Sequence, residues 1–450
     1  MNKKAGAGKL MLARKEISER EGIAMTPSIL SLLILAAIII CFITRIMPLG
    51  ITAAVGAVAM AVTGIITFTD VFSSFISDTV MLVAGMIVVG SALTETGVAD
   101  HVGKKLMNFP GVKNNERFFL LLIIPIVAVF SGFMSNTATV AIFLPLIDCA
   151  VRSTGGRITR KNTYMAVGIS SVVGGNLTLI GSTPQIIAQG ILSSTEGCTA
   201  MTFFELGKGA LPLIAVMLIY YFTFGYSLQR KVLGTNELAV VRDEGPAIEK
   251  KQTSRLKMII CVTVFLAGVI ALMIGFLPPG QLAAGAACIC ILTGCISIKK
   301  ALKTMDWTSI MVLGGAMGFS KGLDRSGALQ MISDHLLGFF GESATPILIM
   351  SAFLVLAAIM GNVMSHTATT SVLVPIVIAI AKGLGSNPTL FAIAVVIGCN
   401  LAFATPISTP PLTMTLKGGY RFNDYVKLGG PLNVLCLIVA IVTLPLIYNI

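Results

Sequence analysis

Charged residues are scarce in this sequence: only 12% of its 450 residues are Asp, Glu, Lys or Arg, whereas 55% are hydrophobic. A soluble domain of ordinary composition carries about 25% charged residues, which cover its water-facing surface. The composition therefore predicts an integral membrane protein. The net charge of +12 does not indicate a nucleic-acid partner, because the basic residues lie in short segments between apolar runs, where charges that set membrane topology belong.

Reactive constellations are missing as well. The sequence has three histidines, and its apolar segments show no HExxH motif, no pair of aspartates and no Ser–His or Ser–Lys dyad, so we expect no enzyme. Cys288 and Cys290 lie in one apolar run without a nearby His, which argues against a cysteine metal site. Because no acidic residue stands alone at the centre of an apolar run, a carboxylate-driven proton antiporter is also disfavoured.

Long apolar segments dominate what is present. A spanning helix needs about 17–25 residues, and several segments are near the lower limit. The polar stretch 1–27 precedes the first of them, and that first run is too long for the core of a cleavable signal peptide. We expect ten crossings, at about 28–47, 50–67, 79–97, 164–180, 206–227, 257–276, 281–298, 309–323, 389–404 and 429–449.

Two further apolar blocks, 118–151 and 346–381, are each interrupted by a polar cluster. The clusters are 131–137, of sequence SGFMSNT, and 361–367, of sequence GNVMSHT. Each block could be two crossings joined by a turn, or a re-entrant hairpin that enters and leaves on one face. The arms are short, about 13–17 residues, and irregular backbone at membrane depth persists only beside protein or a wet cavity. Both points favour re-entrant hairpins.

Two proline-containing breaks follow other spanning segments, at 181–185 and 405–411. Proline removes a backbone donor and disfavours helix in the residue before it, so a helix that reaches such a sequence stops there. The breaks therefore predict two discontinuous helices, one in each part of the chain.

The chain contains an internal repeat. An offset of 230 residues aligns the two parts without a gap from about 48 to 168 and pairs Gly85 with Gly315, Pro145 with Pro375 and Gly168 with Gly398. We therefore predict a first repeat at 28–227, a cytoplasmic linker at 228–256 and a second repeat at 257–450. Each repeat holds five crossings and one hairpin, and because five is odd the repeats must be inverted, an arrangement typical of secondary transporters.

Basic residues predict the orientation. Most loop lysines and arginines lie on the face of the linker, and the opposite face has Lys208, Lys321, Arg325 and Lys382 outside the N-terminal tail, so the linker face is expected in the cytoplasm. The basic N-terminal tail disagrees with this assignment. Either the tail is translocated, or one crossing near residue 50 is miscounted.

The polar clusters at the hairpin tips have a chemistry of their own. A helix start favours an anion, whereas backbone carbonyls at a helix end favour a small cation. Ser135, Asn136 and Thr137 add hydroxyl and amide groups, and repetition of the cluster in both halves favours binding over helix capping alone. His366 stands where the first half has Asn136. It could donate to an anion, titrate near neutral pH, or be a neutral tip residue.

At these motifs the sequence resembles the divalent anion/sodium symporter family. The resemblance rests on SNTATVAIFLP from Ser135, SHTATTSVLVP from Ser365, and the breaks at Thr183-Pro184 and Thr409-Pro410. It implies an all-α polytopic membrane protein of two inverted repeats with about ten transmembrane helices, two re-entrant hairpins and two broken helices. It also implies an elevator mechanism, a homodimer and a place in the plasma membrane, in a bacterium by our expectation.

The resemblance further implies the site residues. Substrate would meet Ser135, Asn136, Thr137, Ser365, His366, Thr367, Thr409 and Pro410. A first sodium ion would be held by Ser131, Ser135, Asn136, Gly181, Ser182 and Thr183. A second would be held by Gly361, Ser365, His366, Ser408 and Thr409.

Two departures from the family pattern concern the second sodium site. His366 replaces an asparagine, and Gly361 stands opposite Ser131, so one hydroxyl is missing. Because imidazole is a poorer sodium ligand than an amide oxygen, coupling could be reduced, proton-assisted or replaced by exchange. We expect a carrier of dianionic organic acids such as succinate, malate or citrate, or of sulfate, with sodium as coupling ion and no other cofactor. A dicarboxylate exchanger, a proton-coupled carrier and a permease for another oxyanion remain alternatives.

Overall fold

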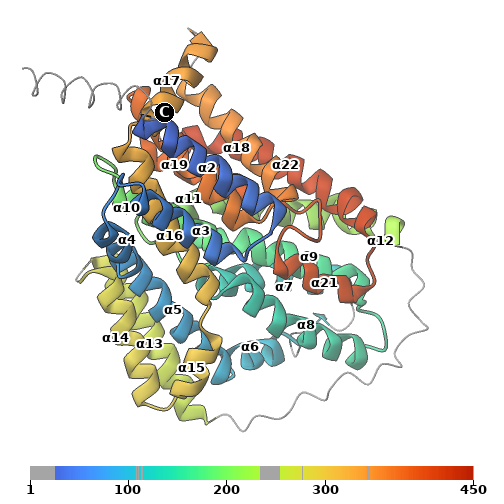
Figure 1. Ribbon diagram of the computed structural model, residues 1–450. Helices are drawn as coiled ribbons and strands as arrows, with labels where there is room; N and C mark the ends of the chain where they lie inside the picture. Colours follow the sequence, from blue (N-terminus) through green and yellow to red (C-terminus); the bar gives the residue numbers. More distant parts are fainter. Residues whose placement is uncertain are drawn as a thin grey trace, which may run out of the picture.

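The computed structural model describes residues 26–107, 109, 111–112, 115–233, 254–275, 277–341 and 345–448, and all regular structure within these ranges is helical (Figure 1). Most of the predicted N-terminal tail and the middle of the predicted linker lie outside these ranges. The elements of the first half are α2 (Pro27–Thr44), α3 (Leu49–Val62), α4 (Phe68–Phe75), α5 (Asp78–Glu95), α6 (Val98–Met107), α7 (Glu116–Phe133), α8 (Asn136–Ser153), α9 (Arg160–Gly174), η2 (Gly175–Leu177), α10 (Thr183–Ser194), α11 (Glu205–Tyr220), η3 (Tyr221–Gly225) and α12 (Tyr226–Leu233).

The second half repeats this order. The bounds of α3, α7 and α8 recur 230 residues later in α14, α18 and α19, so the repeat seen in the sequence is also a repeat of helices. The elements are α13 (Arg255–Ile274), α14 (Pro279–Leu292), α15 (Ile298–Thr304), α16 (Trp307–Arg325), α17 (Ala328–Phe340), α18 (Pro346–Val363), α19 (His366–Gly383), α20 (Pro388–Asn400), α21 (Pro410–Thr415), η5 (Leu416–Gly418) and α22 (Phe422–Tyr448).

Every expected crossing coincides with a helix of the structure. Among the described residues, eight helical stretches are long and apolar enough to span a membrane, and three shorter apolar helices accompany them: α3, α14 and α20. The eight stretches are Pro27–Thr44, Phe68–Glu95, Glu116–Phe133, Glu205–Leu233, Arg255–Ile274, Pro346–Val363, His366–Gly383 and Phe422–Tyr448.

The arms of the two hairpins are longer than the sequence predicted. Helices α7, α8, α18 and α19 have 18 residues each, because residues of the tip clusters and, except in α18, residues beyond the outer ends of the apolar blocks also join the helices. At 1.5 Å per residue such an arm reaches about 27 Å, close to the thickness of a hydrocarbon core. The expected arm length of 13–17 residues was therefore wrong. Re-entrance stays a prediction that rests on the polar tips alone.

The halves pack against each other reciprocally. Helix α3 packs on α16, and its counterpart α14 packs on α5. A Cβ atom built on Gly85 would lie 2.4 Å from the carbonyl carbon of Ala283, and one built on Gly315 would lie 2.4 Å from that of Ala53. Both glycines thus permit close helix contact. Because each contact recurs with its partners exchanged, the halves are related by a pseudo-two-fold axis.

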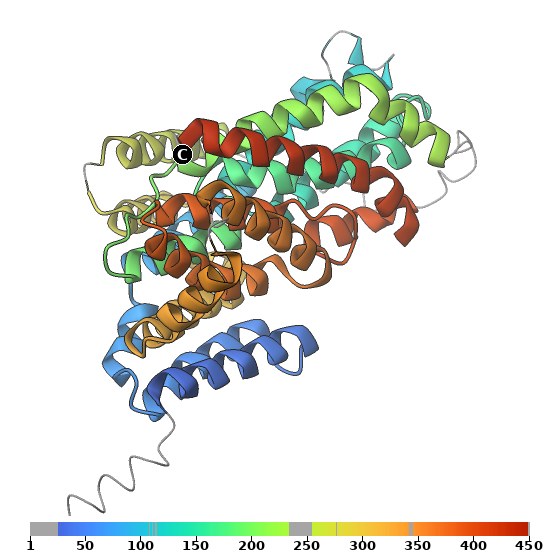
Figure 2. The same cartoon turned by 90° about the horizontal axis from the view of Figure 1, so that it is seen from above.

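Short helices that the sequence analysis missed precede and follow these crossed pairs. They are α4 and α6 in the first half and α15 and α17 in the second. Thr67 caps α4 in a reciprocal capping box with Asp70, which explains how so short a helix begins. In Figure 2, α2 and α3 (dark blue) lie along one edge of the molecule, and α3 is joined there to α4.

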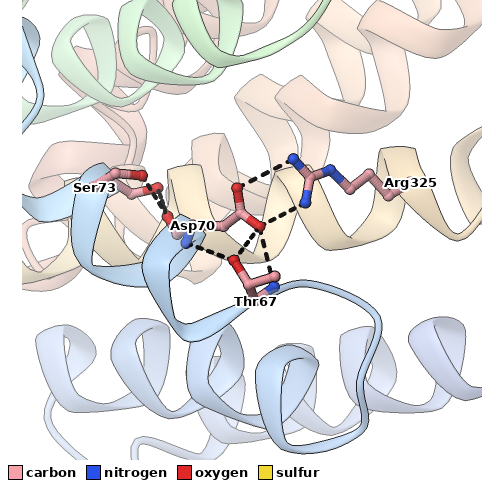
Figure 3. Close-up of polar contacts among 5 residues, drawn as sticks. Thr67, Asp70, Ser73 and Arg325 are labelled. Carbon is pink, nitrogen blue, oxygen red and sulfur yellow. Dashed lines mark hydrogen bonds and ion pairs between the residues drawn. The ribbon is translucent and has the colours of Figure 1, made fainter.

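Two ion pairs connect the halves at these short helices. Arg325, at the end of α16, contacts Asp70 of α4 in a two-pronged pair of 2.6 and 3.1 Å, which Figure 3 shows together with Thr67. Lys300 of α15 pairs with Glu95 at the end of α5. Adding 230 to 70 gives 300, and adding 230 to 95 gives 325. The two bridges therefore occupy equivalent positions with their signs exchanged.

The broken helices also cross between the halves. Helix α21 (red in Figure 1) packs on α8 and α9 of the first half, and α10 packs on α19 and α20 of the second. A Cβ atom on Gly168 would lie 2.6 Å from the Thr415 methyl group, which shows how closely α9 approaches α21. Both predicted breaks are confirmed, but they lie earlier than expected, at 178–182 and 401–409, because Pro184 and Pro410 stand in the first turn of the following helices. Each brings one half's break beside the other half's hairpin.

Candidate functional site

Both hairpin tips are built by the same local rule. Helix α7 ends at Phe133 and α8 begins at Asn136, with Ser135 between them in extended conformation. The Ser135 hydroxyl accepts from the Ala138 amide at 3.3 Å, and the Ser365 hydroxyl accepts from the Ala368 amide at 3.1 Å. Each serine thus caps the returning helix and directs its remaining free amides out of the tip.

Asn136 turns back from the first tip into a cluster of oxygens. The end of its amide that faces the arm lies 2.7 Å from the Ser131 hydroxyl, 3.0 Å from the Ser171 carbonyl and 3.1 Å from the Gly181 carbonyl. Carbonyl oxygens only accept, so the amide nitrogen faces them and donates. Asn136 thereby joins the tip, helix α9 and the first break.

Glycines let the first break approach this cluster. A Cβ atom on Gly181 would lie 2.2 Å from the Gly175 carbonyl oxygen, and one on Gly175 would lie 2.4 Å from the Asn136 amide. The Thr178 hydroxyl donates to the Gly132 carbonyl and holds the break against arm α7. These contacts leave no room for a side chain at either glycine. The fold therefore concentrates carbonyl oxygens around Asn136.

The second tip is arranged differently. His366 is buried, and its Nδ1 lies 3.2 Å from Asn400 Oδ1 at the end of α20. A Cβ atom on Gly361 would lie 2.7 Å from the Cys399 carbonyl oxygen. Ser408 donates to the carbonyls of Ala402 and Thr405 within its own break. Of the residues predicted to hold a second sodium ion, His366 and Ser408 thus bond to different groups.

Of the remaining predicted residues, some are exposed or half-buried, and others form hydrogen bonds with groups other than Asn136. Ser135, Thr137 and Pro410 are exposed at the tips and at the start of α21, where a solute can reach them. Ser365 and Thr367 are half-buried. In the first break, Ser182 donates to Gln185 and Thr183 shares a hydrogen bond of 2.9 Å with Ser309 of α16. Neither of these two hydroxyls is directed to Asn136.

Several polar residues of the site were missed by sequence reasoning. Ser171 contributes a carbonyl to the Asn136 cluster, while Asn176 and Asn400 lie fully buried between the halves. A signal was present, because all three stand inside apolar segments, where polar side chains are costly unless they have a task. Their partners come from distant segments, so spacing along the chain did not reveal them.

The site is electrically uncharged in its side chains but not in its backbone. Helices α8, α10, α19 and α21 begin at the tips and breaks, and each α-helix start carries a partial positive charge. In the part of the chain that the structure describes, no group of three His, Cys, Asp or Glu residues is placed to hold a metal ion. The arrangement suits an anion at the helix starts and a hard monovalent cation among the oxygens.

Known proteins similar to this chain are described as transporters. A family model described as a citrate transporter matches residues 39–371 and 282–450. An uncharacterized transporter of Haemophilus influenzae is 27% identical over 428 residues, which cover 91% of this chain and 89% of that protein. The uncharacterized transporter YfbS of Escherichia coli is 34% identical over 183 residues, which cover 40% of this chain and 30% of that protein. A sodium-dependent dicarboxylate transporter, SdcS of Staphylococcus aureus, is 24% identical and covers 84% of this chain and 78% of its own length.

Solved structures share the fold. The YdaH transporter of Alcanivorax borkumensis, described as having an unusual topology, superimposes with a TM-score of 0.60 over 85% of this chain and 88% of its own, at 14% identity. The MtrF protein of Neisseria gonorrhoeae, described among antimetabolite efflux pumps, gives 0.57 over 94% and 95%, at 13% identity. At these identities the likeness concerns the arrangement of helices and not the transported solute.

Proposed function

Since the chain belongs to the citrate transporter family, a family of multi-pass membrane transporters, we propose that it is a sodium-coupled carrier of di- or tricarboxylates or of sulfate. Its bacterial relatives agree with a place in the plasma membrane. The transported class is drawn from the family name and from the relative described as a sodium-dependent dicarboxylate transporter.

The oxygen cluster around Asn136 is the observation that carries the proposal. The Asn136 amide nitrogen donates to the Ser171 and Gly181 carbonyls. With its amide turned over, Asn136 would present its oxygen, and Asn136, Ser131 and the two carbonyls would together offer sodium an uncharged oxygen shell. A bound ion would then replace the hydrogen bonds of the amide in joining the first tip to the first break.

The anion is proposed to bind where the helix starts converge. A dianion carries two negative groups, and the tips supply starts at α8 and α19 from opposite halves. The exposed hydroxyls of Ser135 and Thr137, with Pro410 beside the start of α21, provide further contacts. Because the site lacks basic side chains among its tip residues, the helix starts and the bound cation together balance the negative charge.

Alternating access is proposed to proceed by an elevator movement in a homodimer. The crossed pairs α3–α16 and α5–α14 form the stationary part, and the hairpins with α9, α10, α20 and α21 move against it. Helix α13 is proposed to lie at the dimer contact, because only 6% of its apolar span is buried within one chain. Its apolar side chains are left for lipid or for a second copy.

Uptake into proteoliposomes tests the proposal. Purified full-length protein is reconstituted, and uptake of labelled succinate, citrate and sulfate is measured with an inward sodium gradient and with choline replacing sodium. We expect stimulation by sodium for at least one of these anions, and saturation with rising sodium. Absence of stimulation by sodium, by a proton gradient and by internal dicarboxylate would overturn carboxylate transport altogether.

A dicarboxylate exchanger is the second candidate, and the second tip favours it. His366 is bonded to Asn400 and not to Ser408, so the second tip lacks the oxygen shell of the first. A carrier with fewer coupling ions returns more readily when loaded with substrate. Efflux of labelled succinate that requires unlabelled succinate outside, and proceeds without sodium, would establish exchange in place of symport.

A further inference from the structure

A chain of buried polar side chains crosses between the halves beside the proposed site. Asn400 Nδ2 lies 2.6 Å from Asn176 Oδ1 and 3.4 Å from Gln185 Oε1, and Asn400 Oδ1 lies 3.2 Å from His366 Nδ1. All four side chains are at most 4% exposed. Asn176 and Gln185 belong to the first half, whereas His366 and Asn400 belong to the second. This chain determines what His366 can offer to a ligand.

Backbone carbonyls fix the direction of the hydrogen bonds at the first-half end. Asn176 Nδ2 faces the Val172 and Val173 carbonyls at 3.4 and 3.3 Å, so its oxygen faces Asn400. Gln185 Nε2 donates to the Gly175 carbonyl at 2.7 Å, so its oxygen faces Asn400 as well. Because carbonyls cannot donate, neither amide can be turned over without losing these bonds.

The direction then propagates to the imidazole. Two oxygens face Asn400 on one side, so Asn400 places its Nδ2 there and turns its oxygen toward His366. That oxygen can only accept, so His366 Nδ1 carries the proton. No acidic side chain of the described ranges bonds to this imidazole, and a buried unpaired charge is costly, so the ring is neutral. Its Nε2 is therefore a bare acceptor.

This acceptor has no partner within the described protein. His366 Nε2 and the Thr409 hydroxyl are both buried and unbonded, and one belongs to the second tip and the other to the second break. An unsatisfied buried polar atom is destabilising, so a native orphan of this kind points to a hydrogen bond supplied from outside the protein, by a water or a ligand. A carboxylate cannot supply it, because two lone pairs would face each other. The missing group is a hydrogen-bond donor.

We propose that His366 Nε2 accepts a hydrogen bond from a hydroxyl group of the substrate and makes the carrier selective for hydroxycarboxylates. This inference rests on the proposed carboxylate transport and names the substrate class within it. The carboxylates occupy the helix starts, and the hydroxyl lies toward the second tip. Asn400, Asn176 and Gln185 act as positioning residues, because they hold the tautomer that leaves Nε2 bare.

Matched substrate pairs test the selectivity. Malate and succinate differ by one hydroxyl, as do citrate and tricarballylate, and each competes with labelled substrate in proteoliposomes containing the full chain. We expect the hydroxylated member of a transported pair to inhibit at about tenfold lower concentration, since a rejected analogue leaves a buried acceptor unpaired. In His366→Asn, whose amide can donate or accept, the ratio falls to within about twofold.

The variant Asn400→Leu distinguishes a role of Asn400 in positioning the His366 imidazole from a purely structural role. Without the Asn400 oxygen, the imidazole can move its proton to Nε2 and donate to a carboxylate, so the ratio between paired substrates falls while uptake of succinate persists. A structural role would reduce both members equally and leave their ratio unchanged. Gly285→Ala, at an exposed position with open space around it, is the matched control and keeps the wild-type ratio.

Nitrogen NMR of histidine-labelled protein reports the tautomer directly. The chain has three histidines, and the His366 signal is assigned by its loss in His366→Asn. We expect a neutral ring protonated on Nδ1, and a shift of the Nε2 resonance when the preferred hydroxycarboxylate binds. A ring protonated on Nε2 would overturn the inference. If carboxylates are taken up without a preference for the hydroxylated member, the hydroxyl selectivity is refuted and the proposed function stands. If no carboxylate is taken up, both the selectivity and the proposed function are refuted.

Discussion

The two hairpin tips have the same backbone and different side-chain chemistry. Both begin their second arm after a capping serine, and their arms have identical lengths. In the first tip Asn136 contacts a hydroxyl and two backbone carbonyls, whereas in the second His366 contacts one amide of α20. A duplicated fold thus keeps its helix starts, which depend on the backbone, and changes its oxygen shell, which depends on side chains.

The difference assigns a separate task to each tip. The first tip has the donor set of a cation site, and the second presents an acceptor that no group of the described protein satisfies. Under the proposed function, the first tip binds the coupling ion and the second tip recognises the substrate. The following predictions test this division, beginning with the largest expected effect.

Gly181→Ala should disable the first tip. The new methyl group would lie 2.2 Å from the Gly175 carbonyl oxygen and would push the break away from Asn136. Overpacking of this kind costs about 1–3 kcal/mol, so sodium-driven uptake should fall about 5- to 150-fold. The second half has Ile407 at the equivalent position, where the side chain is 57% exposed. Ile407→Ala should change uptake less than about twofold, and equal losses in both variants would refute the division.

Ser131→Ala should weaken sodium binding without abolishing uptake. It removes one oxygen that lies 2.7 Å from the Asn136 amide. A hydrogen-bonding group that serves a charged partner is worth about 1.5–3 kcal/mol, so the half-saturating sodium concentration should rise about tenfold or more. Uptake measured as a function of sodium at saturating substrate gives this constant.

The converse change in the second tip sharpens the test. Gly361→Ser supplies the hydroxyl that the first half has, yet its Cβ would lie 2.7 Å from the Cys399 carbonyl oxygen. The substitution should therefore lower activity and leave the affinity for sodium no higher. A second, cooperative sodium dependence in this variant would show that the tips are more alike than we propose.

Glu116→Gln should destabilise the first half selectively. Glu116 is buried and accepts from the Thr159 amide at 2.6 Å, Asn162 at 2.8 Å and Tyr226 at 2.8 Å, which ties α7 to α9 and α12. The second half has Pro346 at this position and no such carboxylate. Loss of the charge should cost about 1–2 kcal/mol and lower the thermal midpoint in detergent. The control Asp334→Asn, at an exposed position, should leave the midpoint unchanged. An unchanged midpoint in Glu116→Gln would contradict a stabilising role of the Glu116 carboxylate.

The paired ion bridges should have the smallest effects. Double-mutant cycles on Asp70 with Arg325 and on Glu95 with Lys300 should each give a coupling below about 1 kcal/mol, because both bridges are partly exposed. Thermal midpoints of the single and double alanine variants supply the data. A coupling above about 2 kcal/mol in one bridge would show that the halves are held together unequally.

The sequence predicted most of the fold because the governing signals are local. Apolar runs, prolines and one repeated offset located every crossing, both hairpins and both breaks. The hairpin arms were predicted too short, because Glu116 and the capping Asn115 extend α7 beyond the apolar block. Helix α4 was missed because its start depends on a capping box and because it is only 8 residues long.

The site was predicted by motif and completed only by tertiary contact. Asn136, Ser131 and Gly181 do come together, as the resemblance implied. Ser182 and Thr183 bond elsewhere, and Asn400 was not anticipated. Spacing along the chain shows that a polar residue lies in an apolar run, but its partner is set by the packing of distant helices. That packing also decides which nitrogen of His366 carries the proton.

The exchanged signs of the two ion bridges bear on how the chain came to be inserted. Two identical halves would carry one charge at 70 and 300 and the opposite charge at 95 and 325, yet this chain has acid at 70 and base at 300. An exposed bridge is worth so little that its sign can reverse during divergence without loss of the fold. If the linker face is cytoplasmic, Glu95 and Lys300 lie inside and Asp70 and Arg325 lie outside, so each face carries one acid and one base whichever way a bridge is signed. The reversal therefore leaves the charge balance of the two faces unchanged, and the other basic residues of the loops must orient the halves in the bilayer.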